Sequence, residues 1–396
     1  MMLKIARTVV MVVAILISVS ACSPSNPEIL YLEGLSAMFK EDGAKPDYEK
    51  AFDYFLRAAE RGHADSQFNV GLMYLEGIGV EKNGKKAFYW FSKSAKQGVA
   101  KAQFNLGLAY SNGDDAPRDN EQAMLWLHKA ADQNLVKAQI LIGTKFNEGN
   151  GVKQDHQQAM QWFKKASDQG SAEANALIGV MFYHGTGVAK DIDTAKIWFD
   201  KAAQQGEPLG QLWLGLLYYF GEGVEKNLSQ AATWISKSAA QGQADAQFTL
   251  GSMYSNGEGV ERDYKQALDW YLLSAMQGNA KAQGNMGWIF QYGKGVEKNS
   301  RLALSWYRKA AFNGNTISQN NLADMYEKGD GIPQDYAQSY AWYAVAAASG
   351  DRDSIKHRDR LAKQLSPEQL ISAQALATRY FERADLQKID SEEQTE

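Results

Sequence analysis

Apolar residues recur at helical spacing along most of the chain, and the pattern repeats every 36 residues. The segment 100–113, AKAQFNLGLAYSNG, places small and large apolar residues three and four positions apart, which is typical of an amphipathic helix. The segment 119–133, DNEQAMLWLHKAADQ, has the same spacing. Polar residues and glycine separate the two segments. The pattern therefore predicts a unit of two helices joined by a turn.

This two-helix unit recurs in register, because three columns of residues keep the 36-residue step. The tryptophans are Trp90, Trp126, Trp162, Trp198, Trp234, Trp270, Trp306 and Trp342. The glycines are Gly71, Gly107, Gly143, Gly179, Gly215, Gly251 and Gly287. The polar residues are Asn83, Asp119, Asp155, Asp191, Asn227, Asp263, Asn299 and Asp335. A fixed period in this range is typical of a solenoid, whose units stack on one another.

The polar column predicts where each second helix begins. Asp and Asn are good N-cap residues, because the side-chain oxygen accepts a hydrogen bond from a free amide of the first turn. A glutamine three residues later is typical of a capping box. It occurs at Gln122, Gln158, Gln230, Gln266 and Gln338.

Glycines predict where the second helices end and how the two helices of a unit are joined. The residue after each second helix is glycine, except for Asn134, and these two residue types favour a left-handed cap. Gly77 and Gly79 in the turn permit backbone angles that other residues avoid. In the segment 113–119, Asp115 replaces the second glycine and Pro117 follows, so we expect a distorted loop there. The turn is not a phosphate-binding loop, since no Gly-Lys-Ser/Thr ending and no strand accompanies it.

Together these residues resemble the Sel-one-like (Sel1-like) repeat, a relative of the tetratricopeptide repeat. The match consists of Ala-x-Ala-Gln-x-x-Leu-Gly-x-x-Tyr, then Gly-x-Gly-Val-x-x-Asp, then Ala-x-x-Trp-Tyr-x-Lys-Ala-Ala, and it covers roughly residues 29–381. The resemblance implies an all-α fold, a right-handed superhelical solenoid with a concave inner surface. It also implies an adaptor or scaffold for protein assembly.

The domain boundaries follow from this register. Residues 29–63 form a divergent N-terminal repeat, and residues 64–351 form eight repeats. Residues 352–384 are expected to be C-terminal capping helices, in which Ser366 is the N-cap, Pro367 the first helical residue and Gln369 the third. Residues 385–396 are a polar, acidic tail.

The chain begins with a different pattern. Residues 1–21 have a basic start and an apolar run of signal-peptide length, and they end in Val-Ser-Ala before Cys22. This ending resembles a bacterial lipobox and implies acylation of Cys22; the alternative is an ordinary secretory signal. Residues 22–28 would then be the acylated cysteine and a short linker. Because Ser23 rather than aspartate follows the cysteine, the resemblance implies an outer-membrane lipoprotein that faces the periplasm of a Gram-negative bacterium.

Composition and motifs exclude several function classes. The formal net charge of −4 and the pI of about 5.9 give no reason to expect nucleic acid binding. The five histidines have no metal-ligand spacing, and no Gly-x-Ser-x-Gly motif is present. Some cysteine-rich family members are associated with beta-lactam binding or hydrolysis, but this chain has a single cysteine. We therefore predict no catalytic, cofactor-binding or metal-binding residues and no enzyme activity.

We interpret the tryptophan column as a structural feature that packs one unit on the next. Two further tryptophans lie outside this column. Trp213 and Trp288 lie on first helices, roughly opposite the core stripe at 100° per residue. By resemblance this face lines the groove. The predicted partner-binding residues are Leu209, Trp213, Leu216, Phe220, Trp288 and Tyr292. The alternative is that curvature of the solenoid buries them against neighbouring helices.

The most direct expectation is a non-enzymatic, membrane-anchored scaffold that holds envelope or secreted proteins or peptides in its groove. Envelope assembly or export would suit such a protein. Two alternatives stay open: an enzyme such as a cell-wall-fragment hydrolase or a beta-lactamase-like protein, and a module that binds a glycan or peptide.

Overall fold

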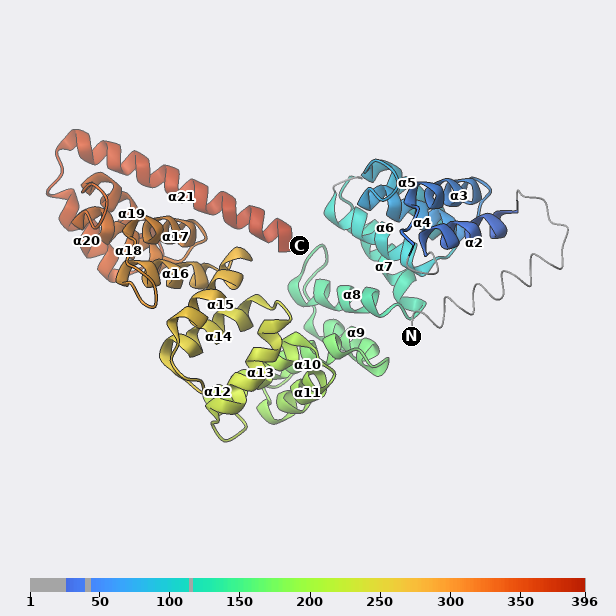
Figure 1. The fold of residues 1–396 in the computed structure, drawn as a ribbon, viewed down its shortest axis with the longest axis horizontal. Helices are drawn as coiled ribbons and strands as arrows, with labels where there is room; N and C mark the ends of the chain where they lie inside the picture. The colour runs from blue at the N-terminus through green and yellow to red at the C-terminus, as the bar shows by residue number, and fades with distance from the viewer. Residues whose placement is uncertain (1–25, 40–43, 114–116, 396) are drawn as a thin grey trace. The chain divides into compact units, whose positions relative to one another are not determined.

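In the computed structural model, the described residues form helices and no strand (Figure 1). The structure describes residues 26–39, 44–113 and 117–395, with backbone alone for 384–395. The first helices of the units are α2 (Pro27–Met38), α4 (Ala64–Glu76), α6 (Ala100–Asn112), α8 (Val136–Glu148), α10 (Ala172–His184), α12 (Pro208–Phe220), α14 (Ala244–Asn256), α16 (Ala280–Tyr292) and α18 (Thr316–Lys328). The second helices are α3 (Tyr48–Glu60), α5 (Gly84–Lys96), α7 (Asn120–Asp132), α9 (His156–Asp168), α11 (Ile192–Gln204), α13 (Leu228–Ala240), α15 (Tyr264–Met276), α17 (Ser300–Phe312) and α19 (Tyr336–Ala348). The predicted all-α solenoid of two-helix repeats is confirmed.

The helix caps follow the sequence pattern, with one correction. The Asp119 carboxylate accepts a hydrogen bond from the Gln122 amide at 3.0 Å, and every second helix has an Asp or Asn cap of this kind. The predicted capping box is wrong, however. The amide of Asp119 donates to the Tyr110 carbonyl at 2.9 Å, so no free amide is left for the Gln122 side chain.

The glycines adopt the backbone conformations that their positions require. Gly98, after α5, has φ +95°, and Gly77 and Gly79 in the turn have φ +73° and +68°. Asn134 has φ +62° and is the only non-glycine residue with positive φ among the described residues. The predicted left-handed caps are confirmed. Residues 114–116, including Asp115, lie outside the described residues, so the expected loop distortion stays a prediction.

In eight of the nine units the core is built around a glycine of the first helix, and α18 has Ala323 at this position. A Cβ placed on Gly71 would lie 2.7 Å from the Phe91 ring, which is buried against the glycine backbone. The equivalent buried residues in the other units are Phe55, Leu127, Phe163, Phe199, Ile235, Tyr271, Tyr307 and Tyr343. In the units of the tryptophan column, each of these residues directly follows the tryptophan. The residue after the tryptophan therefore fills the core.

The tryptophans themselves lie at the surface of the core. Only Trp90 and Trp342 are buried, and the other six of the column are half-buried. A lysine three residues later covers most of these rings; Lys165, for example, lies 3.8 Å from the Trp162 ring centroid. The half-buried indoles pack against the core of the preceding repeat, as Trp126 and Trp162 do, so the predicted packing of one unit on the next is confirmed. The lysine stems and ammonium groups shield the part of each ring that the neighbouring helices leave exposed.

Buried glutamines join consecutive units. The Gln247 side chain donates from Nε2 to the Ala239 carbonyl at 3.2 Å and accepts from Gln277 Nε2 at 2.8 Å. Gln277 Nε2 also lies 2.9 Å from the Gly242 carbonyl. The same pair of contacts occurs at Gln67, Gln103, Gln139, Gln211 and Gln283.

The chain divides into two compact units, residues 1–171 and 172–396, with α2–α9 in the first and α10–α21 in the second. The second ends with α20 (Arg352–Ala362) and α21 (Pro367–Thr395). Ser366 and Gln369 form a reciprocal capping box at the start of α21, with contacts of 3.0 and 3.3 Å. α21 packs against α19 and α17 and extends beyond the expected end of the cap near Asp385.

Candidate functional site

The six predicted partner-binding residues all lie on first helices of the second compact unit. Leu209, Trp213, Leu216 and Phe220 follow one another on α12, and Trp288 and Tyr292 lie on α16. We use the name first-helix face for the positions of every first helix that are equivalent, in the 36-residue register, to Leu209, Trp213, Leu216 and Phe220 of α12. Phe220 and Tyr292 are each 59% exposed, and the other four are half-buried. All six side chains therefore retain some contact with solvent.

Trp213 is held by the preceding repeat. Its indole is stacked on Phe199 with ring centroids 5.5 Å apart and planes at 6°. It also contacts Tyr183 at 4.7 Å and the edge of His184 at 5.4 Å. We call Leu209, Trp213, Leu216 and Phe220, together with Tyr183 and His184, the α12 cluster; Trp213 is packed on three sides by rings of the preceding repeat, and Phe220 is the most exposed member.

A second aromatic group lies on α16. The Trp288 ring is 5.8 Å from Tyr292, one helical turn later, and 6.3 Å from Tyr264 on α15. Lys294 lies 6.0 Å from the indole centroid, so a cation borders this group. Tyr292 is its most exposed member.

The two groups are separated by one repeat. The corresponding positions of α14 are Thr249, Ser252 and Asn256, which carry polar side chains. Ser252 accepts a hydrogen bond from the buried Tyr271 hydroxyl at 3.1 Å. The structure thus places the six residues in two aromatic clusters on the same series of helices rather than in one uninterrupted aromatic floor.

Two tyrosine hydroxyls at the α12 cluster interact with glutamates in the turn of the next repeat, where its first helix ends. Tyr219 donates to Glu258 at 2.7 Å, and burial together with Glu258 raises the pKa of the Tyr219 hydroxyl to about 12. Burial and Glu222 raise the pKa of the Tyr183 hydroxyl to about 12 in the same way. Both phenols are therefore neutral hydrogen-bond donors at physiological pH.

The sequence interpretation missed Tyr183, His184 and Tyr264, which complete the two clusters. His184 occupies the same repeat position as Phe220 and Tyr292, where the other repeats have Glu76, Asn112, Glu148, Asn256 and Lys328. A comparison of that column alone would have revealed it. Tyr264 lies on a second helix, α15. Its contact with Trp288 on the first-helix face depends on how α15 packs against α16, which the sequence pattern does not give.

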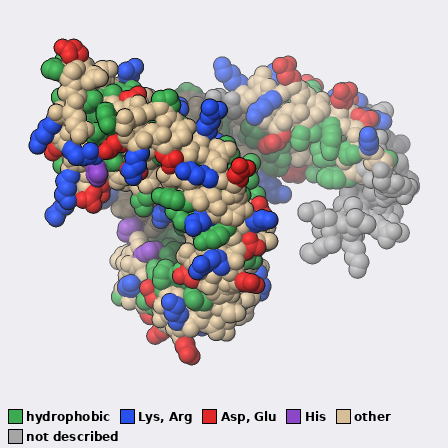
Figure 2. All heavy atoms as spheres, turned by 60° about the vertical axis from the view of Figure 1, so that its left-hand side comes forward, with side chains coloured by type: hydrophobic (Ala, Val, Ile, Leu, Met, Phe, Trp, Pro, Cys, Tyr) green, Lys and Arg blue, Asp and Glu red, His purple; other side chains and the backbone are tan. Residues whose placement is uncertain are grey.

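Charged and apolar side chains are interspersed on the face of the molecule shown in Figure 2, with no large area of one sign. Within the described residues, no three His, Cys, Asp or Glu side chains converge in a way that could hold a metal ion. None of the helices in the described part of the chain is long and apolar enough to cross a membrane. Cys22, the predicted lipidation site, and the signal segment lie outside the described residues.

Comparison with known proteins identifies the repeat. A family described as "Sel1 repeat" matches residues 30–63, 64–99, 100–135, 136–171, 172–207, 208–243, 244–279, 280–315 and 316–351. A Sel1 repeat protein from Oxalobacter formigenes is 32% identical, with a TM-score of 0.57, over 63% of this chain and all of that one (100%). The c5321 protein, a protective antigen of uropathogenic Escherichia coli with an SLR fold, is 29% identical over 91% of this chain and 92% of that one, with a TM-score of 0.49. No curated protein matches the chain.

Proposed function

The chain belongs to the Sel1 repeat family, and on that basis we propose that it is a membrane-anchored scaffold that binds a partner protein or peptide on its first-helix face. Sel1 repeat solenoids generally bind protein partners. The proposed anchor is acylated Cys22, which would hold the repeats at the outer membrane, facing the periplasm. A role in assembly or export of envelope components fits this location.

The α12 cluster is the observation that carries the proposal. Its positions are polar in most repeats, yet α12 presents Trp213 and Phe220, with Phe220 59% exposed. Aromatic side chains bury a large area on binding and lose little conformational entropy, so they are effective anchors. Trp213 is already immobilised by stacking on Phe199, which further reduces the entropic cost of binding.

The two exposed aromatics provide a test that spares the core. The full-length protein, solubilised in detergent, is crosslinked to an envelope extract, and the captured partner is then purified for affinity measurement. We expect Phe220→Ala with Tyr292→Ala to weaken binding of that partner by about tenfold or more, since anchors dominate interface energy. Trp213→Ala with Trp288→Ala should weaken it further.

Ile197→Ala is the matched control, because Ile197 is 66% exposed but lies on a second helix, α11. Near-ultraviolet circular dichroism verifies the fold of each variant. Unchanged affinity in both aromatic double variants, or recovery of cell-wall fragments in place of a protein, contradicts the proposed site. For the anchor, Cys22→Ala should abolish incorporation of labelled fatty acid and release the chain from membranes; retention of the label refutes acylation at Cys22.

A further inference from the structure

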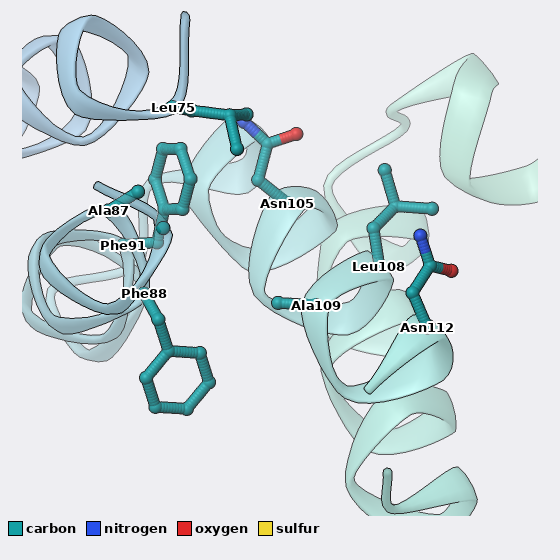
Figure 3. A pocket seen from close by; sticks show the side chains of 9 residues that line it. Leu75, Ala87, Phe88, Phe91, Asn105, Leu108, Ala109 and Asn112 are labelled. Carbon is teal, nitrogen blue, oxygen red and sulfur yellow. The ribbon is translucent and has the colours of Figure 1, made fainter. Parts of the chain in front are cut away.

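A pocket of about 170 Å³ lies between α4, α5 and α6 in the first compact unit (Figure 3). Its walls include Leu75, Phe88, Phe91 and Leu108. A dry cavity of about 150 Å³ is large enough to accept a benzene ring in other proteins. The pocket therefore matches the size of one large apolar side chain.

The pocket exists because each of two consecutive repeats lacks a side chain at this junction. Ala109 occupies a position where the first helices α4, α8, α10, α12, α14, α16 and α18 have Met73, Lys145, Met181, Leu217, Met253, Ile289 and Met325, all of them buried. Gly84 begins α5, where the other second helices begin with Tyr48, Asn120, His156, Ile192, Leu228, Tyr264, Ser300 and Tyr336. Both residues line the pocket. Gly84 belongs to the repeat 64–99 and Ala109 to the repeat 100–135, so among the repeats from α4 onward the two small residues meet only at this junction.

Two amide side chains line the pocket from α6. Asn105 is half-buried and Asn112 is exposed, and neither makes a hydrogen bond within the described residues. They are seven residues apart on one helix face, hence about 10 Å apart along the axis. Three residues of an extended chain span about the same distance. The two amides can therefore contact the main chain of an extended segment on either side of one side chain that enters the pocket.

Basic residues outnumber acidic ones beside the lining residues of the pocket, with Lys82, Lys85, Lys86 and Lys101 against Glu76 and Glu81. Lys85 and Lys86 lie in the first turn of α5, which contains no acidic residue, although a helix N-terminus favours negative charge. Lys101 lies one turn before Asn105 on α6. None of these three lysines forms an ion pair with a carboxylate in the described part of the chain. This charge complements acidic residues in a bound segment.

We propose that this pocket binds one large apolar side chain of an extended acidic peptide segment, whose main chain is held by Asn105 and Asn112. The proposal deepens the scaffold function, because it adds a second recognition site, of different chemistry, to the first-helix face. The α12 cluster offers exposed aromatic anchors, whereas this site takes a side chain into a cavity.

Peptides selected from a random dodecapeptide library on the detergent-solubilised full-length protein test the proposal. We expect selected peptides to share one Leu, Met or Phe flanked by Asp or Glu, and we measure their affinity by fluorescence anisotropy. Ala109→Met fills the cavity with the residue that the fold uses at this position elsewhere. It should weaken binding about tenfold or more and leave the melting temperature unchanged or higher. Asn105→Ala should weaken binding by about three- to tenfold.

Phe220→Ala, in the other compact unit, is the control that separates this proposal from the general one. Affinity lost in Ala109→Met but retained in Phe220→Ala supports the pocket. The reverse result overturns the pocket and leaves the scaffold function standing. Selected peptides that share no apolar residue also overturn it, as does a higher melting temperature with undiminished binding, which identifies the cavity as a packing void.

Discussion

At the scale of single residues, a glycine in every first helix except α18 sets how closely the second helix approaches. In α16, a Cβ on Gly287 would lie 2.6 Å from Cδ1 of Tyr307, whose ring is completely buried. A buried ring cannot move aside without disturbing its neighbours, since protein interiors are close-packed. This contact explains why eight of the nine first helices carry glycine at a helical position where it is intrinsically unfavourable; α18, with Ala323 in register with Tyr343, is the exception.

Gly287→Ala should therefore destabilise the protein by about 1–3 kcal/mol through overpacking. Gly284→Ala is a control on the same helix. Its added Cβ would lie 2.6 Å from the Ser318 hydroxyl oxygen and in ordinary contact with Asn315 Oδ1 at 3.6 Å. The Ser318 hydroxyl has no hydrogen-bond partner among the described residues, so it can rotate away without losing a bond. We expect Gly284→Ala to be neutral or to stabilise by up to about 1 kcal/mol. Urea unfolding of both variants checks this prediction, and equal effects of the two substitutions would contradict it.

Residue-level predictions from the sequence succeeded where the interaction is local. The Asp119 cap and the left-handed Asn134 depend on a few neighbouring residues, so their residue types identify them. The half-burial of Trp126 depends on how far adjacent helices extend over it. The role of Gln122 depends on whether the Tyr110 carbonyl has already taken the cap amide. Neither property can be inferred from spacing alone.

At the scale of helices, the buried glutamines connect each second helix to the next first helix and to the following repeat. Gln247 contacts the end of α13 through the Ala239 carbonyl and the end of α15 through Gln277. A single side chain thus fixes three helices of two consecutive repeats. Because the amide has both a donor and an acceptor, it satisfies both contacts in a buried site.

Gln247→Leu should lower the free energy of unfolding by about 1–3 kcal/mol, because the Gln277 amide loses one of its two acceptors and the Ala239 carbonyl loses one donor. Gln230→Ala is the matched control. Gln230 is exposed and its side chain caps nothing, so we expect a change within about 0.5 kcal/mol. Guanidinium unfolding monitored by circular dichroism compares the two. A Gln247→Leu variant as stable as Gln230→Ala would show that the buried glutamines contribute no stability.

Helix periodicity also predicted which side chains belong to the first-helix face, but not how each is covered. The half-burial of Trp213 arises from Phe199 and Tyr183 in the preceding repeat, which no single-helix pattern contains. The pocket beside Asn105 results from side chains that are absent at Ala109 and Gly84. Aligning the repeats by column reveals both truncations, whereas the helix pattern, which only counts apolar positions, does not.

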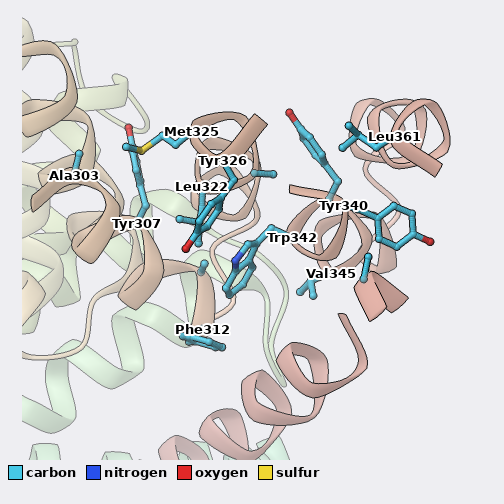
Figure 4. Packing of buried hydrophobic residues seen from close by; sticks show 14 residues of the cluster. Ala303, Tyr307, Phe312, Leu322, Met325, Tyr326, Tyr340, Trp342, Val345 and Leu361 are labelled. Atoms are coloured by element: carbon cyan, nitrogen blue, oxygen red, sulfur yellow. The ribbon is translucent and has the colours of Figure 1, made fainter. Parts of the chain in front are cut away.

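At the scale of the whole molecule, each repeat is stabilised by its neighbours, so the last repeat needs a cap. In the second compact unit, α21 supplies it. Tyr380 is stacked on Trp342 with centroids 4.5 Å apart, and its hydroxyl donates to Gln338 at 2.7 Å. Figure 4 shows Trp342 and Phe312 among the buried residues of this terminal cluster. Without α21, both rings would face solvent.

The last repeats should therefore lose protection first when this cap is weakened. Tyr380→Ala removes the ring over Trp342, and we expect a loss of about 2–3 kcal/mol, less than for a fully buried ring, because Tyr380 is half-buried. Amide hydrogen exchange should accelerate most in α18 and α19 and progressively less toward α10, since coupling passes only between adjacent repeats.

Tyr380→Phe is the first control, because it keeps the stack on Trp342 and loses only the hydrogen bond to Gln338, so its effect should be about 1 kcal/mol. Phe381→Ala, at a neighbouring position 46% exposed, controls for loss of an aromatic ring from the same helix. A uniform acceleration from α10 to α19 would mean that the second compact unit unfolds as one cooperative body, and the nearest-neighbour description of the repeats would then fail.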